Sequence, residues 1–462
     1  MSKYSKRIIA AAVAAIMVGA SFAGCTPKEN SGTDASGSGT DGKAGKVYFL
    51  NFKPEQDEAY QAIAKEYTEK TGVTVKVVTA ASGTYEQQLK SEIAKTEAPT
   101  IFQVNGPVGY ATWKDYCVDL KDSELYGHLL DKSIAIKGAD DGVYGIPFAI
   151  EGYGIIYNKA IMDKYFAMEG AKVKSVDEIK DFNTLKTVVE DMQSKKSQLG
   201  IDGVFASTSL AKGEDWRWQT HLANIPLYYE WQDNNIDLGN ADATKEIKFQ
   251  YNSNFKNIFD LYLNNSTVDP KLTGSKTVND SMAEFALGKA AMVQNGNWAY
   301  SQVSESSGNV VKAEDIKFMP IYTGMADDSK QGLCIGTENF FCINSKASAE
   351  DQKASLDFLT WLYTSEEGKA HVTKELGFIA PFDTFGDSDK PEDPLAQDVL
   401  NWSAKTDVTN VPWNFTIFPS QAFKDNFGSY LAQYAQGKMS WDDVTAKVIS
   451  DWKSEIANSQ AS

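Results

Sequence analysis

The sequence predicts an α/β fold for the folded body of this chain, and two observations carry the prediction. Strand-like and helix-like segments alternate from residue 46 onward, beginning in the order strand, helix, strand, helix, strand. Apolar residues make up 42% of the chain, which is enough to build a core between a sheet and covering helices. This alternation is typical of a parallel sheet with helices packed on its faces.

The first elements follow from local patterns. Lys46–Phe52 is an apolar strand, after which Pro54 opens a helix that Gly72 closes. A strand, a helix and a strand are then expected at residues 73–79, 84–95 and 100–104. In open α/β sheets ligands bind beyond the carboxyl ends of the strands, so the segments that follow these strands are candidate ligand contacts.

The remainder of the body has mainly helical patterns. Residues 159–300 are expected to be largely helical. The tail from Pro419 predicts two helices, the second beginning near Trp441 after a break at Gly437. No internal repeat is visible, so the body is not expected to be a repeat array.

The N-terminus has the pattern of a lipoprotein signal peptide. An uncharged apolar run, Ile8 to Ala23, follows three basic residues and is too short for a comfortable membrane span. It ends in Phe22-Ala23-Gly24-Cys25, which resembles the bacterial lipobox, whose cysteine becomes lipid-modified. We therefore expect residues 1–24 to be a signal peptide, with Cys25 anchoring the mature protein at the extracellular face of the cell membrane.

A flexible tether is expected at residues 25–45, because this segment is rich in Gly, Ser, Thr and Asp. Within it, residues 37–42 satisfy G-x-G-x-x-G literally. They neither follow a strand nor open a patterned helix, so no phosphate site is predicted there.

The charge and the cysteines exclude other classes of protein. A formal net charge of −17 should repel phosphate backbones, so no nucleic-acid partner is expected. Lipidation of Cys25 would leave Cys117, Cys334 and Cys342, an odd number, and we predict no structural disulfide. The three histidines are too sparse for a metal or catalytic cluster, so no metal, no cofactor and no enzymatic activity are predicted.

Two long segments resemble one known family. Tyr144–Lys159 (YGIPFAIEGYGIIYNK) contains a strand resembling GIP, the acidic residue Glu151 and a strand ending in YNK. Phe285–Val303 (FALGKAAMVQNGNWAYSQV) has an aromatic residue, the run GKAAM, a glycine and Trp298 in the family's order. Gly336–Ser348 is a weaker third match. Together they resemble the family 1 extracellular solute-binding proteins, the maltose-binding-protein-like group of carbohydrate ABC importers.

This resemblance implies a periplasmic-binding-protein-like clamp of two lobes joined by three hinge crossings. Lobe one is expected at residues 46–150 and 324–375, and lobe two at residues 151–323 and 376–462. The crossings are expected near Glu151, Ile321–Gly324 and Gly377–Pro381. The resemblance also implies a monomer that captures a sugar between the lobes and delivers it to the permease subunits of an ABC importer.

The resemblance and the chemistry of sugars together select the candidate ligand-binding residues. Aromatic rings suit the apolar C–H faces of a sugar, and carboxylates or amides suit its hydroxyl groups. Trp298 and Glu151 are the first candidates. The others are Trp216, Trp218, His221, Trp413, Phe415, Asn105, Lys53 and Glu55. Because alternating helix positions face different sides, at most one of Trp216 and Trp218 is expected to reach the ligand.

Two alternatives remain open from the sequence. A secreted glycoside hydrolase would also carry aromatic rings and carboxylates. A solute other than a sugar, such as a peptide or a polyamine, is the second alternative. Gln103 and Asn105 stand where maltose binders present an aromatic residue and an acid, which argues against maltose itself.

Overall fold

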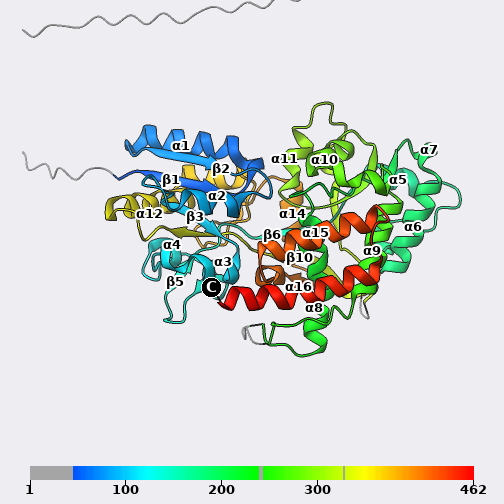
Figure 1. Ribbon diagram of the computed structural model, residues 1–462. Coiled ribbons are helices and arrows are strands. Elements are labelled where there is room, and N and C mark those ends of the chain that lie inside the picture. Colours follow the sequence, from blue (N-terminus) through cyan, green and yellow to red (C-terminus); the bar gives the residue numbers. More distant parts are fainter. Residues whose placement is uncertain (1–44, 239–242, 326–327, 462) are drawn as a thin grey trace, which may run out of the picture. The chain divides into compact units, whose positions relative to one another are not determined.

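The computed structural model describes residues 45–238, 243–325 and 328–461. The body from Lys43 to the C-terminus is one compact unit. The predictions for the signal peptide, for Cys25 and for nearly all of the tether lie outside the described residues. Within the body, two lobes of mixed helix and strand confirm the predicted α/β class (Figure 1).

The first lobe is built on a four-stranded sheet in the order β11-β3-β1-β2. Its strands are β1 (Val47–Asn51), β2 (Val75–Thr79), β3 (Ile101–Val104) and β11 (Phe340–Ile343). The predicted parallel β–α–β–α–β order is confirmed, because β1 pairs in parallel with both β2 and β3. All five residues of β1 are buried, as expected for a central strand covered on both faces.

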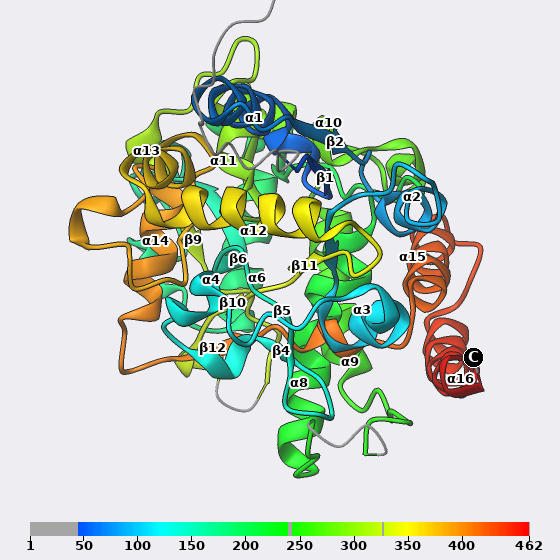
Figure 2. The same cartoon turned by 90° about the vertical axis from the view of Figure 1, so that its left-hand side faces the viewer.

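Helices cover both faces of this sheet (Figure 2). They are α1 (Asp57–Thr71), α2 (Tyr85–Glu92), α3 (Gly106–Trp113), α4 (Glu124–Gly127), α12 (Ala349–Thr364) and α13 (Glu366–Ala370). In α1 the side chains of Tyr60, Ile63 and Tyr67 are buried on one face. Gly72 ends α1 in the left-handed conformation, with φ of 76°, as its position predicted. A small ribbon, β4 (Ile136–Lys137) with β5 (Val143–Gly145), completes the lobe.

The second lobe is built on a sheet in the order β12-β10-β6-β8-β7, with β9 also paired to β6. The strands are β6 (Glu151–Asn158), β7 (Gly203–Phe205), β8 (Ala290–Gly296), β9 (Ile316–Met319), β10 (Gln331–Gly336) and β12 (Thr409–Pro412). The central strand β6 is buried along its whole length and runs antiparallel to β8, β9 and β10. Both segments that carry the family resemblance therefore contribute neighbouring strands, β6 and β8.

Ten helices surround the second sheet in the described part of the chain. They are α5 (Lys159–Phe166), α6 (Phe182–Ser194), α7 (Lys196–Leu199), α8 (Ala223–Asp233), α9 (Asn252–Asn264), α10 (Val278–Ala286), α11 (Ala299–Ser304), α14 (Pro394–Ser403), α15 (Gln421–Ala435) and α16 (Trp441–Ala461). The predicted helical middle and the two predicted tail helices are confirmed. In Figure 1, α15 and α16 lie beside α9, and Trp441 of α16 stacks on Phe255 of α9.

The chain passes from the first lobe to the second next to Glu151. Ala149 packs in the core of the first lobe and Tyr153 in the core of the second. The chain returns from the second lobe to the first at residues 337–339, between β10 and β11, rather than near Ile321–Gly324 as predicted. The prediction missed this point because β10 pairs with β6 and β12 in the second sheet, and no local pattern in the sequence reveals that pairing.

The last passage also lies later in the chain than the sequence suggested. Phe382 packs in the core of the first lobe, and Phe385 packs against it. Leu395 and Val399 of α14 pack in the core of the second lobe. The passage therefore lies between Phe385 and Leu395 instead of near Gly377–Pro381, because tertiary contacts hold residues 378–385 against the first lobe.

Buried cysteines lie in both lobes. Cys117, Cys334 and Cys342 are free thiols, and Cys334 and Cys342 stand on strands of different sheets, β10 and β11. Among the residues that the structure describes, no helix combines the length and the apolar character that a membrane crossing requires.

Candidate functional site

A cavity of about 600 Å³ lies between the two lobes. Its walls include segments that follow strands: residues 52–55 after β1, Asn105 after β3 and Trp298 after β8. Glu151, at the start of β6, also lines it. This is the position expected for a ligand site in α/β lobes, beyond the strand ends, and the volume is in the usual range for a small-molecule pocket.

A polar turn after β1 aims Lys53 into the cavity. The side-chain amide of Asn51 donates to the carbonyl oxygen of Lys53 over 2.8 Å, and its oxygen accepts from the Lys53 backbone N–H over 3.1 Å. Pro54 then opens a short helix, η1 (Pro54–Gln56), which carries Glu55. Asn51, in the buried strand, thus fixes the backbone from which both charged side chains project.

Lys53 joins the two lobes through a buried ion pair. Its Nζ lies 2.7 Å from Oε1 of Glu151 and 3.3 Å from Oε1 of Glu55. The side chains of Lys53 and Glu151 are only 5% and 2% exposed. Burial disfavours the ammonium, but the two carboxylates outweigh it and raise the pKa of Lys53. The cation also lies 5.3 Å from the ring centre of Trp298.

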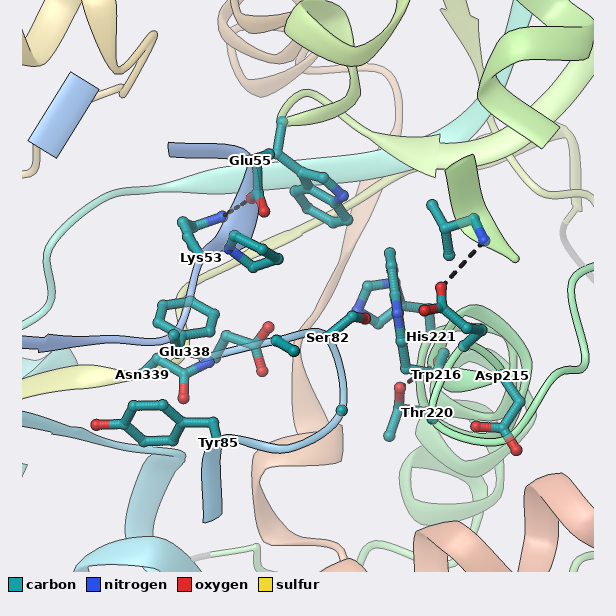
Figure 3. A pocket seen from close by; sticks show the side chains of 18 of the residues that line it. Lys53, Glu55, Ser82, Tyr85, Asp215, Trp216, Thr220, His221, Glu338 and Asn339 are labelled. Atoms are coloured by element: carbon teal, nitrogen blue, oxygen red, sulfur yellow. Dashed lines mark hydrogen bonds and ion pairs between the residues drawn. The ribbon is translucent and has the colours of Figure 1, made fainter. Parts of the chain in front are cut away.

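The opposite wall is a π-helix, η5 (Arg217–Leu222), preceded by Trp216. Its wider turn carries Gln219, Thr220 and His221 to the cavity. Figure 3 shows Thr220 and His221 on this helix and Trp216 at its start, across the cavity from Lys53. Fully buried Arg217 anchors the helix by donating to the carbonyl oxygen of Gln294 in β8, over 2.9 Å.

His221 is held as a neutral ring. It stacks on Tyr153, with ring centres 4.3 Å apart and an angle of 9° between the planes, and it is enclosed by Trp298 and Phe415 at 5.5 and 5.1 Å. Burial, reinforced by the nearby Arg217, lowers the pKa of His221 to about 3. The imidazole therefore offers a flat, uncharged surface and a hydrogen-bonding nitrogen rather than a cation.

Two tryptophan rings line the cavity side by side. The centres of Trp216 and Trp298 are 6.1 Å apart, with an angle of 53° between the planes. Trp298 lies directly over Gly296, where a Cβ would come within 2.1 Å of the ring. Asn297 fixes this loop, since its N–H donates to the Gly152 oxygen over 3.0 Å and its Oδ1 accepts from the Gly152 N–H over 2.9 Å. The Asn-Gly-Asn loop thus presents the ring.

Most of the predicted ligand-binding residues meet in this cavity. The eight that line it are Lys53, Glu55, Asn105, Glu151, Trp216, His221, Trp298 and Phe415.

Trp218 and Trp413, both candidate ligand-binding residues, do not line the cavity. That Trp216 lines it and Trp218 does not agrees with the expectation that at most one of this pair would reach it. Trp218 is 3% exposed, donates its indole N–H to the Ser209 carbonyl oxygen over 2.9 Å and packs against Tyr262. Trp413 lies behind the lining, packed on Gly336 and in contact with Phe415. Both are packing residues because their rings point into the core of the second lobe.

Several lining residues were missed by the sequence reasoning. The chief ones are Ser82, Tyr85, Glu86, Asp215, Gln219, Thr220, Gln302, Glu338, Asn339 and Lys424. Gln219 and Thr220 follow Trp216 by about one helical turn, which was a usable signal. Glu338 and Asn339 sit on the connection between β10 and β11, and Lys424 lies in α15, where no local pattern marks them.

The two lobes touch at glycines around the cavity. A Cβ on Gly83, in the first lobe, would lie 2.6 Å from the carbonyl oxygen of Gly213 in the second. A Cβ on Gly106 would lie 2.6 Å from Cβ of Thr416. Such close approach of backbones leaves no room for side chains, so these contacts close the cavity.

A family of known proteins matches most of the chain. The sequence profile described as bacterial extracellular solute-binding protein matches residues 62–401. No curated protein matches the chain.

Solved structures share the fold at low sequence identity. A chitin oligosaccharide binding protein has a TM-score of 0.72 and 17% identity, covering 90% of this chain and 100% of its own. The raffinose complex of the solute-binding protein RafE has a TM-score of 0.63 and 17% identity, and the match covers 88% of this chain and 99% of RafE. Maltose-bound MalE3 of T. maritima has a TM-score of 0.65 and 14% identity, and the match covers 89% of this chain and 99% of MalE3. These likenesses show that the chain has the two-lobed fold of periplasmic solute-binding proteins.

Proposed function

The chain belongs to the family of bacterial extracellular solute-binding proteins, and from that premise we propose that it captures a sugar or oligosaccharide between its lobes. The observation that carries the proposal is the meeting of tryptophan rings and buried hydrogen-bonding groups in one cavity. Trp216 and Trp298 suit the faces of sugar rings, and Glu55 with Glu151 suits hydroxyl groups.

The expected affinity follows from these contacts. Covering one face of a sugar ring removes roughly 60 Å² of apolar surface from water, worth about 1.5 kcal/mol. Two such faces and several hydrogen bonds that are each worth about 1 kcal/mol place the dissociation constant in the micromolar range, after the cost of association.

The related structures support a carbohydrate ligand without identifying it. The three named above are described with chitin oligosaccharide, raffinose and maltose. Since these sugars differ in size and linkage, the choice made by this chain rests on its own lining residues.

We infer that the protein works as an anchored receptor for an importer. The family is extracellular, and the N-terminal pattern predicts a lipid on Cys25. The captured sugar would be handed to the permease subunits of an ABC transporter. Mass spectrometry of the protein isolated from its own membranes should find a lipid-modified Cys25 as the first residue. A mature protein that begins elsewhere would remove the anchor from the proposal.

The capture step is proposed to close the lobes about three connections. These connections lie near Glu151, at residues 337–339 and between Phe385 and Leu395, the points where the chain changes lobes. A ligand that touches both walls binds the closed form best and shifts the population toward it. X-ray scattering should show a smaller radius of gyration with a bound sugar, and an unchanged radius would count against closure.

A glycan array followed by calorimetry tests the main proposal. The protein should bind a subset of oligosaccharides with micromolar dissociation constants and release them unchanged. Failure of every sugar, together with binding of peptides or polyamines, would refute sugar capture. Catalytic release of shorter sugars would favour a glycoside hydrolase instead.

A further inference from the structure

Three amide side chains of the cavity lining have oxygens without a hydrogen-bond donor in the described part of the chain. The side-chain oxygens of Asn105, Gln219 and Gln302 are buried and accept no hydrogen bond from any described residue. Gln219 lines the cavity and is only 3% exposed. Leaving such groups unpaired costs about 1–3 kcal/mol each, and a ligand rich in donors would satisfy them.

The lining also carries an excess of negative charge. In the described part of the chain, eight of its side chains are carboxylic acids: Glu55, Glu86, Glu151, Glu214, Asp215, Glu305, Glu338 and Asp425. Of its two ammonium groups, Lys53 is paired with Glu151 and Glu55. Lys424 forms no ion pair with a described residue and lies in the longer-range field of Glu338, Glu86 and Asp425.

In the described part of the chain, Asp215 and Glu338 are two of the six acids in this set that have no counter-charge within ion-pair distance. Among the described residues, neither Asp215 nor Glu338 has a cationic nitrogen within the 4.0 Å that defines an ion pair, and Asp215 is only 6% exposed, against Gly428 of α15. Burial raises the pKa of Asp215 to about 7, with Asp425 and Glu214 adding to the effect. Burial likewise raises the pKa of Glu338 to about 7, against the opposing field of Lys424. An incoming cation would stabilise both as carboxylates.

From this lining we propose, building on the proposed sugar-binding function, that the cavity selects oligosaccharides by charge: it takes amino sugars with protonated amines in preference to neutral sugars and rejects uronic acids. An ammonium group brings three donors and a positive charge to Asp215, Glu338 and the unpaired amide oxygens. The faces of Trp216 and Trp298 attract the same cation. A uronate would bring a further carboxylate to a lining that already holds eight acids against two ammonium groups.

Three trisaccharides with one backbone test the proposal. The β-1,4-linked glucosamine trimer and cellotriose differ only in an ammonium or a hydroxyl group at C2, and the β-1,4-linked glucuronic acid trimer supplies the anion. Calorimetry at pH 6 and low salt should show the glucosamine trimer binding at least tenfold more tightly than cellotriose. The glucuronic acid trimer should show no measurable binding. Raising the salt concentration should weaken only the glucosamine trimer.

Two isosteric variants locate the preference. D215N and E338Q should each reduce the advantage of the glucosamine trimer over cellotriose at least threefold. The matched control is E246Q, because Glu246 is an exposed carboxylate outside the cavity. If a variant fails to fold, the comparison of the three sugars on the unaltered protein still decides the question.

The outcomes separate this inference from the function on which it rests. The charge selection is overturned if cellotriose, or any neutral sugar on the glycan array, binds as tightly as the glucosamine trimer or more tightly. Sugar capture would still stand in that case. Tight binding of the glucuronic acid trimer overturns it as well. If no sugar on the array binds, the proposed function fails and the inference fails with it.

Discussion

A methyl group on Gly83 should hold the two lobes apart. In G83A the new Cβ would lie 2.6 Å from the carbonyl oxygen of Gly213 and 2.8 Å from its Cα. The first distance is about 0.8 Å shorter than the 3.4 Å at which ordinary contact begins. Because the opposing atoms belong to backbone, no side-chain rotation relieves the clash, and the lobes themselves must separate.

Gly72 supplies the matched control. Gly72 and Gly83 both have positive φ, at 76° and 68°, so alanine costs about 1–2 kcal/mol of backbone strain at either position. A Cβ on Gly72 meets nothing within 4 Å. Only G83A therefore carries the additional overpacking cost, about 1–3 kcal/mol, and only in the closed form. That cost lowers the apparent affinity for a sugar roughly 5- to 150-fold.

Calorimetry and scattering check this prediction. For a sugar that the unaltered protein binds, G83A should lose affinity in the stated range, and G72A should stay within twofold. Scattering at a fixed concentration of that sugar should show a larger radius of gyration for G83A alone, while both variants lose similar thermal stability. Unchanged affinity in G83A, or an equal loss in both variants, would mean that contact between these glycines has no part in closure.

Three further predictions concern single side chains. Trp298→Ala should weaken sugar binding about tenfold, because one stacked face is worth about 1.5 kcal/mol, while Trp402→Ala, outside the cavity, should leave calorimetric affinity unchanged. Lys53→Met should lower the free energy of unfolding by about 3–5 kcal/mol, because the substitution leaves Glu151 buried without a counter-charge. Denaturant titrations should show that adding Glu151→Gln restores most of the lost stability. Burial raises the pKa of Asp393 to about 7, so the folded protein binds this proton more tightly than the unfolded chain does, and stability is lost as the pH rises from about 4 to 7. Asp393→Asn, which keeps an N-cap group for α14, should flatten that part of the melting-temperature profile, and an unchanged slope would refute the assignment.

The sequence reasoning succeeded where short-range patterns decide the structure. The order β1, α1, β2, α2, β3 followed from apolar runs and from breakers such as Gly72, whose left-handed backbone ends α1. The ordered motif in Phe285–Val303 likewise selected Trp298, and the ring does line the cavity. In these cases the residues that determine the conformation are neighbours in the chain.

It failed where distant segments decide. Trp413 is an aromatic residue two positions before Phe415, which does line the cavity, yet its ring points into the core. A π-helix after Trp216 sets which side chains of residues 217–222 face the cavity, and the sequence showed only helical spacing. Glu338 and Lys424 meet in the cavity although they lie on different elements far apart in the chain.

The sequence by itself determined the α/β class, the acidic character of the chain and the two segments that place Glu151 and Trp298, because composition, periodicity and ordered motifs are properties of neighbouring residues. Only the tertiary structure decided that β10 joins the second sheet, that the lobes meet at Gly83 and Gly213, and that unpaired carboxyl groups collect in the cavity. Those features depend on which strands pair and which backbones approach one another, and such long-range contacts leave no local pattern in the chain.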